Sequence, residues 1–427
     1  MIGSTAAKPH SSAPWLAELC VSRAAFTLIF TAYSAAIPLL QRDWSMSAAQ
    51  AGLVQSAWHF GYLISLFGVG FLADRFGAKR VFVASGIAAS ASALLFAFFA
   101  DGFVSGLLLY GLTALMSGGS YTPGLTLIAE GYPPQRRGRA MGYYLAASSL
   151  GYAVSLILSG LITPHAGWRG AFVATACGPL AGTLIAAYAL RATPNVVHPR
   201  PQEHGSVHSL RQVLRNKPAM LLIWAYTFHS WELLGMWAWM PSFLAAASVS
   251  GTSIGERAAA LGAMLTALTY ITSMAGSIFG GSLSDRLGRC YVILILSCAS
   301  LACSFAYGWM IGLPLWLLVG VAAAYNVTAI GDSSIYSTAV TELVPAQYLG
   351  AAFSIRSVLG FGAGVISPWV FGLVLDAVHA GAPQAQSQAL AWGLAWSSLG
   401  LGAVLGPLMT LKLRAAPEAR NMAGGRR

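Results

Sequence analysis

The stretch GFLADRFGAKR, residues Gly70–Arg80, decides how the rest of this 427-residue sequence is interpreted. A related stretch, GSLSDRLGRCY, occupies Gly281–Tyr291, 211 positions further along the chain. A repeat at this distance predicts two halves of similar structure. The matched positions are Gly70 and Gly281, Leu72 and Leu283, Asp74 and Asp285, Arg75 and Arg286, and Gly77 and Gly288.

Charged residues are scarce throughout the chain. They make up 9% of it and apolar residues 56%, whereas about 25% of a soluble globular protein is charged. The mean hydropathy is +0.66. So few charges cannot cover a water-exposed surface, so we expect a surface that faces lipid. The net charge of +11 does not indicate nucleic-acid binding, because the basic residues are spread between apolar runs rather than gathered on one face.

Twelve apolar runs are long enough to cross a bilayer, which takes about 20 residues in a helix. Six crossings separate the two copies of the repeat, and this even number gives the two halves parallel topology. The sequence therefore predicts an all-α membrane protein with twelve transmembrane helices in two parallel six-helix pseudo-repeats. The runs span about residues 15–40, 47–73, 80–100, 103–130, 138–163, 169–190, 219–246, 257–283, 290–311, 314–341, 347–375 and 387–413.

A long polar connection, residues 191–218, separates the two halves. We expect an N-terminal six-helix bundle at 15–190 and a C-terminal one at 219–413, with tails at 1–14 and 414–427. Placing the N-terminus in the cytoplasm puts 19 of the 24 Lys and Arg residues on the cytoplasmic side, three outside and two within helices. This asymmetry predicts that both termini and the linker are cytoplasmic.

The pattern G-x-L-x-D-R-x-G-x-[KR]-R after the second helix resembles the signature loop of the major facilitator superfamily. A weaker copy after the eighth helix and GWRGAF (Gly167–Phe172) at the start of the sixth helix strengthen the resemblance, which covers about residues 15–413. The resemblance implies the major facilitator fold and secondary active transport by alternating access. The fold it implies holds its cavity within one chain, so we expect a monomer. Very short loops suit a bacterial inner membrane, and without a Gly-x-Ser-x-Gly elbow, HExxH or phosphate-binding loop no enzyme is predicted.

The same resemblance implies a latch between the halves on the cytoplasmic side. Gly70 would allow close helix packing and Gly77 a tight turn. Asp74 would lie at the N-terminus of the eleventh helix, where the helix dipole favours a carboxylate, and Asp285 near the fifth. The alternative is that these charges only mark topology. The predicted latch residues are Gly70, Asp74, Arg75, Gly77, Arg80, Glu130, Arg139, Asp285 and Arg286.

Two departures from the family pattern bear on the substrate. The fourth helix keeps its glycines over Leu107–Tyr121 but has no Arg there, and the fifth helix has no Gly-Pro pair. Many drug/proton antiporters carry that pair. Both absences weaken an interpretation as a multidrug exporter.

Two arginines lie within predicted helices: Arg23 in the first and Arg356 in the eleventh. A charge inside hydrocarbon costs at least about 2.5 kcal/mol, so each needs a reason. An arginine offers a rigid, permanently charged fork that matches a carboxylate, which predicts an anionic substrate. The alternative is structural pairing, of Arg356 with Asp332 and of Arg23 with Glu18.

Glu232 in the seventh helix is the predicted proton site, because burial at mid-membrane favours the protonated form of a carboxylate. His229 lies three residues before it, on the same helix face, and is predicted to share or relay the proton. Asp332 is a further candidate. The alternatives are a permanently protonated Glu232, or one paired with Arg23.

Aromatic and amide side chains of the same helices are predicted to line the substrate site, with helix packing as the alternative role. The predicted substrate contacts are Tyr33, Trp58, Tyr121 and Asn326, and further candidates are Gln55, His59, Tyr270, Tyr325 and Tyr336.

Together these observations predict proton-coupled symport of a small organic anion, a carboxylate, through a protein embedded in the lipid bilayer. Two alternatives stay open: proton-antiport efflux of a drug-like or cationic metabolite, and a sensor or assembly protein that uses a transporter fold without transport. No cofactor is predicted. His198, His204 and His208 have metal-like spacing but no acidic or Cys partner, so no metal site is predicted.

Overall fold

The computed structural model describes residues 12–197, 206–249, 254–381 and 384–426, which form helices and no strand. The first part of the chain forms α1 (Ala13–Phe26), η1 (Thr27–Ile29), α2 (Ala32–Asp43), α3 (Ala48–Phe76), α4 (Ala78–Phe99), α5 (Phe103–Ser117), η2 (Gly118–Ser120), α6 (Thr122–Gly131) and α7 (Pro134–Ala189). The second part forms α8 (Ser206–Arg215), α9 (Lys217–Ala247), α10 (Glu256–Leu287), α11 (Arg289–Tyr307), η3 (Gly308–Met310), α12 (Leu315–Gly331), α13 (Ser333–Leu343), η4 (Ala346–Tyr348), α14 (Leu349–Gly381), α15 (Gln384–Ala403), α16 (Leu405–Ala415), η5 (Pro417–Asn421) and η6 (Ala423–Gly425).

Twelve crossings are present, as the sequence predicts. Among the described residues, ten segments are long and apolar enough to span a membrane. One of them, Arg139–Ala189, is 51 residues long, about twice what one crossing needs, and it breaks at Gly167 with φ 62°. It therefore crosses twice. The remaining crossing, the seventh along the chain, is α9. Its 31 residues include Trp, His and Glu side chains that lower its mean hydropathy.

Three predicted spans are broken near their middle. The first span breaks between α1 and α2, the fourth at Tyr121 and the tenth at Asp332. Tyr121 and Asp332 are 211 positions apart, so the last two breaks occupy matched positions of the repeat. The internal repeat thus extends from the signature loops to the backbone at the centre of the molecule.

Helix α3 shows how local sequence sets the position of the site. Its start is a capping box, in which the Ser47 side chain accepts from the Gln50 backbone N–H and the Gln50 side chain accepts from the Ser47 N–H. Its end is Gly77, whose φ of 86° suits glycine. The helix thus runs straight from one end of the molecule to the signature loop at the other.

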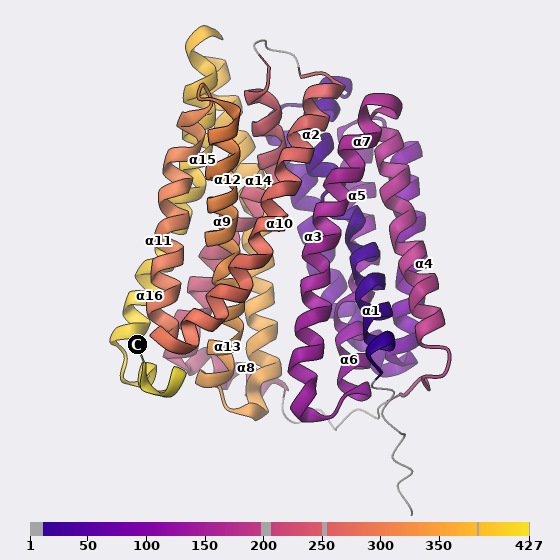
Figure 1. Cartoon of the computed structure of the whole chain (residues 1–427), viewed down its shortest axis with the longest axis vertical. Coiled ribbons are helices and arrows are strands. Elements are labelled where there is room, and N and C mark those ends of the chain that lie inside the picture. The colour runs from indigo at the N-terminus through magenta and orange to yellow at the C-terminus, as the bar shows by residue number, and fades with distance from the viewer. Residues whose placement is uncertain (1–11, 198–205, 250–253, 382–383, 427) are drawn as a thin grey trace, which may run out of the picture.

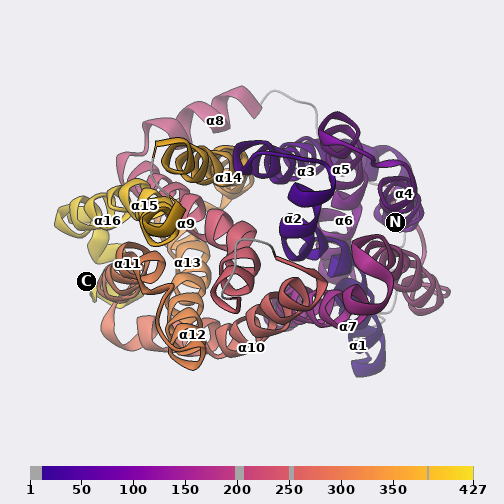
Figure 2. The same ribbon diagram turned by 90° about the horizontal axis from the view of Figure 1, so that it is seen from above.

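The helices stand side by side in two groups, with the N-terminal part of the chain in one and the C-terminal part in the other (Figure 1; Figure 2). We call the end that carries both signature loops the motif end and the opposite end the closed end. The start of α1 and the C-terminal residues both lie at the motif end, in different groups (Figure 1).

The buried core differs between these two ends. At the closed end one apolar cluster contains residues of both groups, such as Tyr33 and Trp168 with Phe243 and Trp396. At the motif end the core consists of two separate clusters, one in the N-terminal group and one in the C-terminal group. The two groups are therefore packed together at the closed end and parted at the motif end.

Small residues allow the close approach at the closed end. A Cβ on Gly52 of α3 would lie 2.2 Å from the Pro368 carbonyl oxygen of α14, and one on Gly372 would lie 2.2 Å from the Ala48 carbonyl oxygen. The contacts of α3 with α14 and of α7 with α10 are the most extensive between the groups. Glycine at such positions lets backbones touch where lipid supplies no hydrophobic drive.

The linker contains a helix that the sequence analysis missed. Helix α8 is seen side-on where the spanning helices are seen end-on, so it lies across their ends (Figure 2). Val213 of α8 is buried and Leu214 exposed. The amphipathic spacing of SVHSLRQVLR is the signal that could have revealed this helix.

Candidate functional site

Arg23 of α1 lies in a buried polar environment and is 4% exposed. Its Nε donates to the Ser148 hydroxyl of α7 at 2.8 Å, and its Nη1 donates to the Ser120 hydroxyl of η2 at 2.6 Å. Its guanidinium also lies 5.4 Å from the centre of the Tyr121 ring. No described carboxylate lies within ion-pair distance, so the alternative pairing with Glu18 is absent. Neutral hydroxyls hold this cation and leave its charge uncompensated.

Arg356 of α14 is the corresponding cation of the C-terminal group. Its Nη1 donates to the Ser337 hydroxyl of α13 at 2.7 Å, and its guanidinium lies 4.5 Å from the centre of the Tyr226 ring of α9. Its Nε is buried without a hydrogen-bond partner among the described residues. The alternative pairing with Asp332 is absent here too.

Tyr121 links the two arginines, because its hydroxyl lies within electrostatic range of both Arg23 and Arg356. Tyr62 of α3 lies beside Arg23 and packs edge-on against Phe361 of α14, with ring centres 5.4 Å apart. The structure therefore brings the two predicted cations to one region between the groups. Two cations without a counter-charge form a site of strong positive potential.

His229 and Asp332 form a buried pair beside this region. The His229 Nδ1 lies 3.1 Å from the Asp332 Oδ1, and its Nε2 lies 2.9 Å from the Ser333 hydroxyl. The His229 ring also packs 5.7 Å from that of Tyr226, which carries Arg356 on its face. Contacts thus run from Asp332 through His229 and Tyr226 to the arginine.

Glu232 faces the interior of the C-terminal group instead of the arginines. It is 3% exposed and accepts hydrogen bonds from the hydroxyls of Ser300 at 3.0 Å and Ser304 at 2.6 Å, both on α11. The Ser304 hydroxyl in turn hydrogen-bonds the Tyr325 hydroxyl. The alternative pairing of Glu232 with Arg23 is absent, and hydroxyls satisfy this carboxyl in either protonation state.

Three other predicted contacts lie away from the arginines. Tyr33 donates to the Ala51 carbonyl at 3.1 Å, Trp58 packs 4.7 Å from the Tyr110 ring, and both belong to the closed-end core. Asn326 accepts from Trp237 at 3.2 Å and donates to Thr269 at 2.9 Å. In this conformation these three side chains hold helices together.

The first signature loop is tied to the start of the linker. A Cβ on Gly77 would lie 2.3 Å from the Asn195 side chain, which accepts from the Arg80 N–H and donates to the Phe76 carbonyl. Lys79 donates to the carbonyls of Leu190 and Thr193, at 2.6 and 2.9 Å. The expected tight turn at Gly77 is therefore present.

The remaining residues of the predicted latch lie at the motif end, where the two groups have separate cores. A Cβ on Gly70 would meet no atom within 4 Å, so the close packing expected there is absent in this conformation. Arg139 donates to Tyr143 of its own helix at 2.9 Å. Asp74, Arg75, Arg80, Glu130, Arg139, Asp285 and Arg286 are all exposed.

The second signature loop holds its own group together. Arg289 at the start of α11 donates to both carboxylate oxygens of Glu342 in α13, at 2.9 and 3.3 Å. It also lies 2.5 Å from Asp285. A buried arginine with a bidentate partner is a strong local clamp.

Polar contacts that the sequence analysis missed join the two groups at the closed end. The two carboxylate oxygens of Asp376 in α14 accept from the backbone N–H groups of Ala48 and Ala49, both at 2.8 Å. A carboxylate at a helix N-terminus also meets the positive end of the helix dipole. On the surface, Arg42 of α2 pairs with Glu256 of α10 at 2.9 Å.

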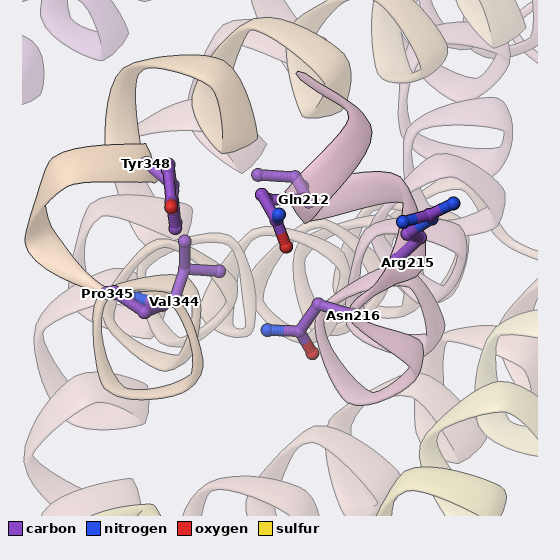
Figure 3. A pocket seen from close by; sticks show the side chains of 7 residues that line it. Gln212, Arg215, Asn216, Val344, Pro345 and Tyr348 are labelled. Atoms are coloured by element: carbon purple, nitrogen blue, oxygen red, sulfur yellow. The ribbon is translucent and has the colours of Figure 1, made fainter. Parts of the chain in front are cut away.

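One cavity lies at the motif end, away from the arginines. It measures about 220 Å³ and lies between α8 and the turn after α13, with Gln212, Asn216, Val344 and Tyr348 among its lining residues (Figure 3). The described residues include no group of three or more His, Cys, Asp or Glu side chains suited to a metal. His198 and His204 lie outside the described residues.

The sequence model of the Major Facilitator Superfamily matches residues 19–368. This chain belongs to that family. The match covers most of the chain and includes both arginines, so the family fold, the twelve crossings and the membrane location rest on sequence and structure alike. The family and the relatives below are transporters, which agrees with the expectation that the chain is not an enzyme.

Among curated relatives, the probable sulfoacetate transporter SauU of Cupriavidus necator is 26% identical over 88% of this chain and 90% of the relative. The hexuronate transporter of Bacillus subtilis is 25% identical, over 81% and 84%. The cis,cis-muconate transport protein of Acinetobacter baylyi is 26% identical, over 58% and 60%.

Solved structures share the fold. The nucleoside transporter NupG superposes with a TM-score of 0.72 at 14% identity, covering 93% of this chain and 99% of that one. A bacterial homologue of the human lysosomal transporter Spinster gives 0.71 at 19% identity, with coverage of 98% and 99%.

Several residues around the arginines escaped the sequence analysis, namely Tyr62, Ser120, Tyr144, Ser148, Tyr226 and Ser337. Serine and tyrosine are common in membrane helices, so the residue type alone does not indicate a site. Only their position on a helix face that meets an intramembrane arginine could have indicated it.

Proposed function

We propose that this family member carries small organic anions, carboxylates in particular, across the bacterial inner membrane together with a proton. The observation that carries the proposal is the pair of intramembrane arginines, one from each group, with no described carboxylate to neutralise either. The transporters of sulfoacetate, hexuronate and muconate among its relatives support the same substrate class.

The anion would bind between Arg23 and Arg356, with Tyr121 beside it. Each guanidinium keeps donors that the serine hydroxyls do not use, and the Nε of Arg356 has no partner in the described residues. A carboxylate could accept from both arginines and satisfy the buried Nε.

The proton would be held by the acidic groups of the C-terminal group. His229 lies within electrostatic range of Asp332, Glu232 and Arg356. A proton taken up by this cluster removes negative charge near Arg356 and changes how strongly that arginine attracts an anion. Coupling of proton to substrate follows from this link. Glu232, with its serine and tyrosine partners, would carry the proton. The His229–Asp332 pair would transmit the change in charge at Glu232 to Arg356.

Alternating access would come from rocking of the bundles 15–190 and 219–413 about the arginines. We place the motif end in the cytoplasm because the basic residues gather there, so the present conformation would be open inward. The signature-loop charges would form their latch when this end closes. One chain would suffice, because the site lies between its own two halves.

Uptake into proteoliposomes tests the proposal. A panel of labelled organic anions would be offered to wild type, Glu232→Gln and Arg356→Ala, with and without an inward proton gradient. Wild type should accumulate at least one anion only when the gradient is present. Arg356→Ala should lose uptake by about 100-fold or more, because a charged partner is removed at a buried site. Glu232→Gln should lose gradient-driven accumulation and retain exchange.

Matched surface variants control for folding and charge. Arg211→Ala and Glu418→Gln remove an exposed residue of each type and should leave uptake within about twofold of wild type. Accumulation of cations, or of no anion under any gradient, would contradict the proposal and favour efflux or a sensor. Accumulation that ignores the gradient would contradict proton coupling alone.

A further inference from the structure

A small cavity lies between the two groups on the closed side of the arginines. It measures about 10 Å³, the size of about one water. Gln55 and His59 of α3 line it from one group, with Ser34 of α2, and Trp237 of α9 lines it from the other. A space walled by both halves changes shape whenever the halves move.

Polar atoms that face no partner surround this cavity. His59 is 2% exposed and Gln55 3%. Both ring nitrogens of His59 and the Oε1 of Gln55 lack a hydrogen-bond partner among the described residues. Buried polar atoms are satisfied in nearly all proteins. Three unsatisfied ones at a single cavity indicate that something from outside the chain binds there.

The chemistry of the two side chains defines what fits. A neutral imidazole offers one donor and one acceptor, and an amide oxygen only accepts. A hydroxyl can accept from the imidazole N–H and donate to Gln55 Oε1 at the same time. A carboxylate cannot donate to Gln55, and a methyl group can satisfy neither side chain.

The spacing along α3 relates this cavity to the arginines. His59 precedes Tyr62 by three residues and Gln55 precedes it by seven, which corresponds to about 4.5 and 10 Å along the helix axis. Tyr62 lies beside Arg23. A molecule with its carboxylate at the arginines therefore reaches the cavity with a group some four to six carbons away.

We propose that Gln55 and His59 form a hydroxyl-binding subsite, and that the substrate is a hydroxylated organic acid whose hydroxyl lies about four to six carbons from its carboxylate. The subsite deepens the proposed function and rests on it, because the arginines hold the other end of the same molecule. Phe30 and Trp237, whose ring centres lie 6.1 Å apart, also line the cavity.

Two acids that differ by one hydroxyl test the subsite. Binding of 6-hydroxyhexanoate and of hexanoate to the purified full-length protein would be measured by isothermal titration calorimetry. Wild type should prefer the hydroxylated acid by about tenfold or more, the value of one or two well-placed hydrogen bonds. In His59→Phe and in Gln55→Leu the two acids should bind with about equal affinity, while hexanoate still binds.

Control variants separate the possible outcomes. His165→Phe changes an exposed histidine and should keep the wild-type preference. Arg356→Ala should lose both acids. Arg356-dependent binding without preference for the hydroxyl in wild type would overturn the subsite alone and leave a structural water as the occupant. A preference that survives in both His59→Phe and Gln55→Leu would overturn it as well. Failure of wild type to bind any organic anion would instead contradict the proposed function.

Discussion

The two ends of this transporter, which both halves of the repeat help to form, differ in what holds the groups together. At the closed end one apolar core, glycine contacts and Asp376 join the two groups. At the motif end each group has its own core, and clamps such as Arg289–Glu342 stay within one group. Contacts between groups are therefore concentrated at one end, and contacts within groups stabilise the other.

The contacts that must break during a transport cycle are therefore those of the closed end: the shared apolar packing, the glycine contacts and Asp376. The separate cores of the motif end are each close-packed and can move as units. Between the two ends lie Arg23 and Arg356, held by hydroxyls of their own groups. The anion that they attract would bridge the groups whichever end is open.

The largest effect is expected from wedging the closed end apart. In Gly52→Leu the new Cβ would lie 2.2 Å from the Pro368 carbonyl oxygen. Overpacking of this kind costs about 1–3 kcal/mol or more. We expect loss of uptake and at least tenfold faster thiol labelling of a cysteine introduced at buried Ser34. Unchanged labelling would show that this contact does not keep the end closed.

Gly70→Leu on the same helix is the matched comparison. A Cβ there meets nothing within 4 Å, so the melting temperature should stay close to the wild-type value. Ser34 labelling should not rise, because the packing of the closed end is unchanged. Uptake should nevertheless be lost, because the motif end could not close over this side chain. Normal uptake would contradict the packing role expected of Gly70 in the latched state.

A smaller shift is expected from Asp376→Ala. It removes a carboxylate that accepts two backbone N–H groups at the start of α3, and charge-assisted hydrogen bonds are worth about 1.5–3 kcal/mol. The fraction of molecules in which the two groups have parted at the closed end should rise by about tenfold, and this should be seen as faster Ser34 labelling. Asp376→Asn keeps one acceptor and should lie between this variant and wild type.

Glu342→Gln should lower stability without favouring either end. It weakens the clamp to Arg289 within the C-terminal group, at a cost of about 1–2 kcal/mol. A lower melting temperature with unchanged Ser34 labelling is the expected result. Altered labelling would show that this clamp also takes part in the motion.

The smallest effect is expected from Arg42→Gln. Arg42 and Glu256 are 46% and 43% exposed, and exposed ion pairs contribute at most about 1 kcal/mol. Uptake and labelling should stay within about twofold of wild type at physiological ionic strength. A large change would mean that this surface pair, and not the buried packing, controls the closed end.

The signature loop predicted the family, and the apolar runs predicted the number of crossings. They could not predict the rotation of each helix about its axis, because that depends on packing against partners far away in sequence. The sequence therefore did not show that Glu232, the predicted proton site, faces Ser300 and Ser304, or that Tyr33 and Trp58 lie in the closed-end core. Asp376 escaped notice because its backbone partners are over 300 residues away.

Distances measured across both ends test directly whether the two groups rock about the two arginines. Spin labels at exposed Phe76 and Leu287 report on the motif end, and labels at Val104 and Leu313 report on the closed end, each pair in a background without other cysteines. A transported organic anion, added at acidic pH, is expected to shorten the 76–287 distance and lengthen the 104–313 distance together. Distances that stay fixed, or that change in the same direction, would contradict alternating access about the two arginines.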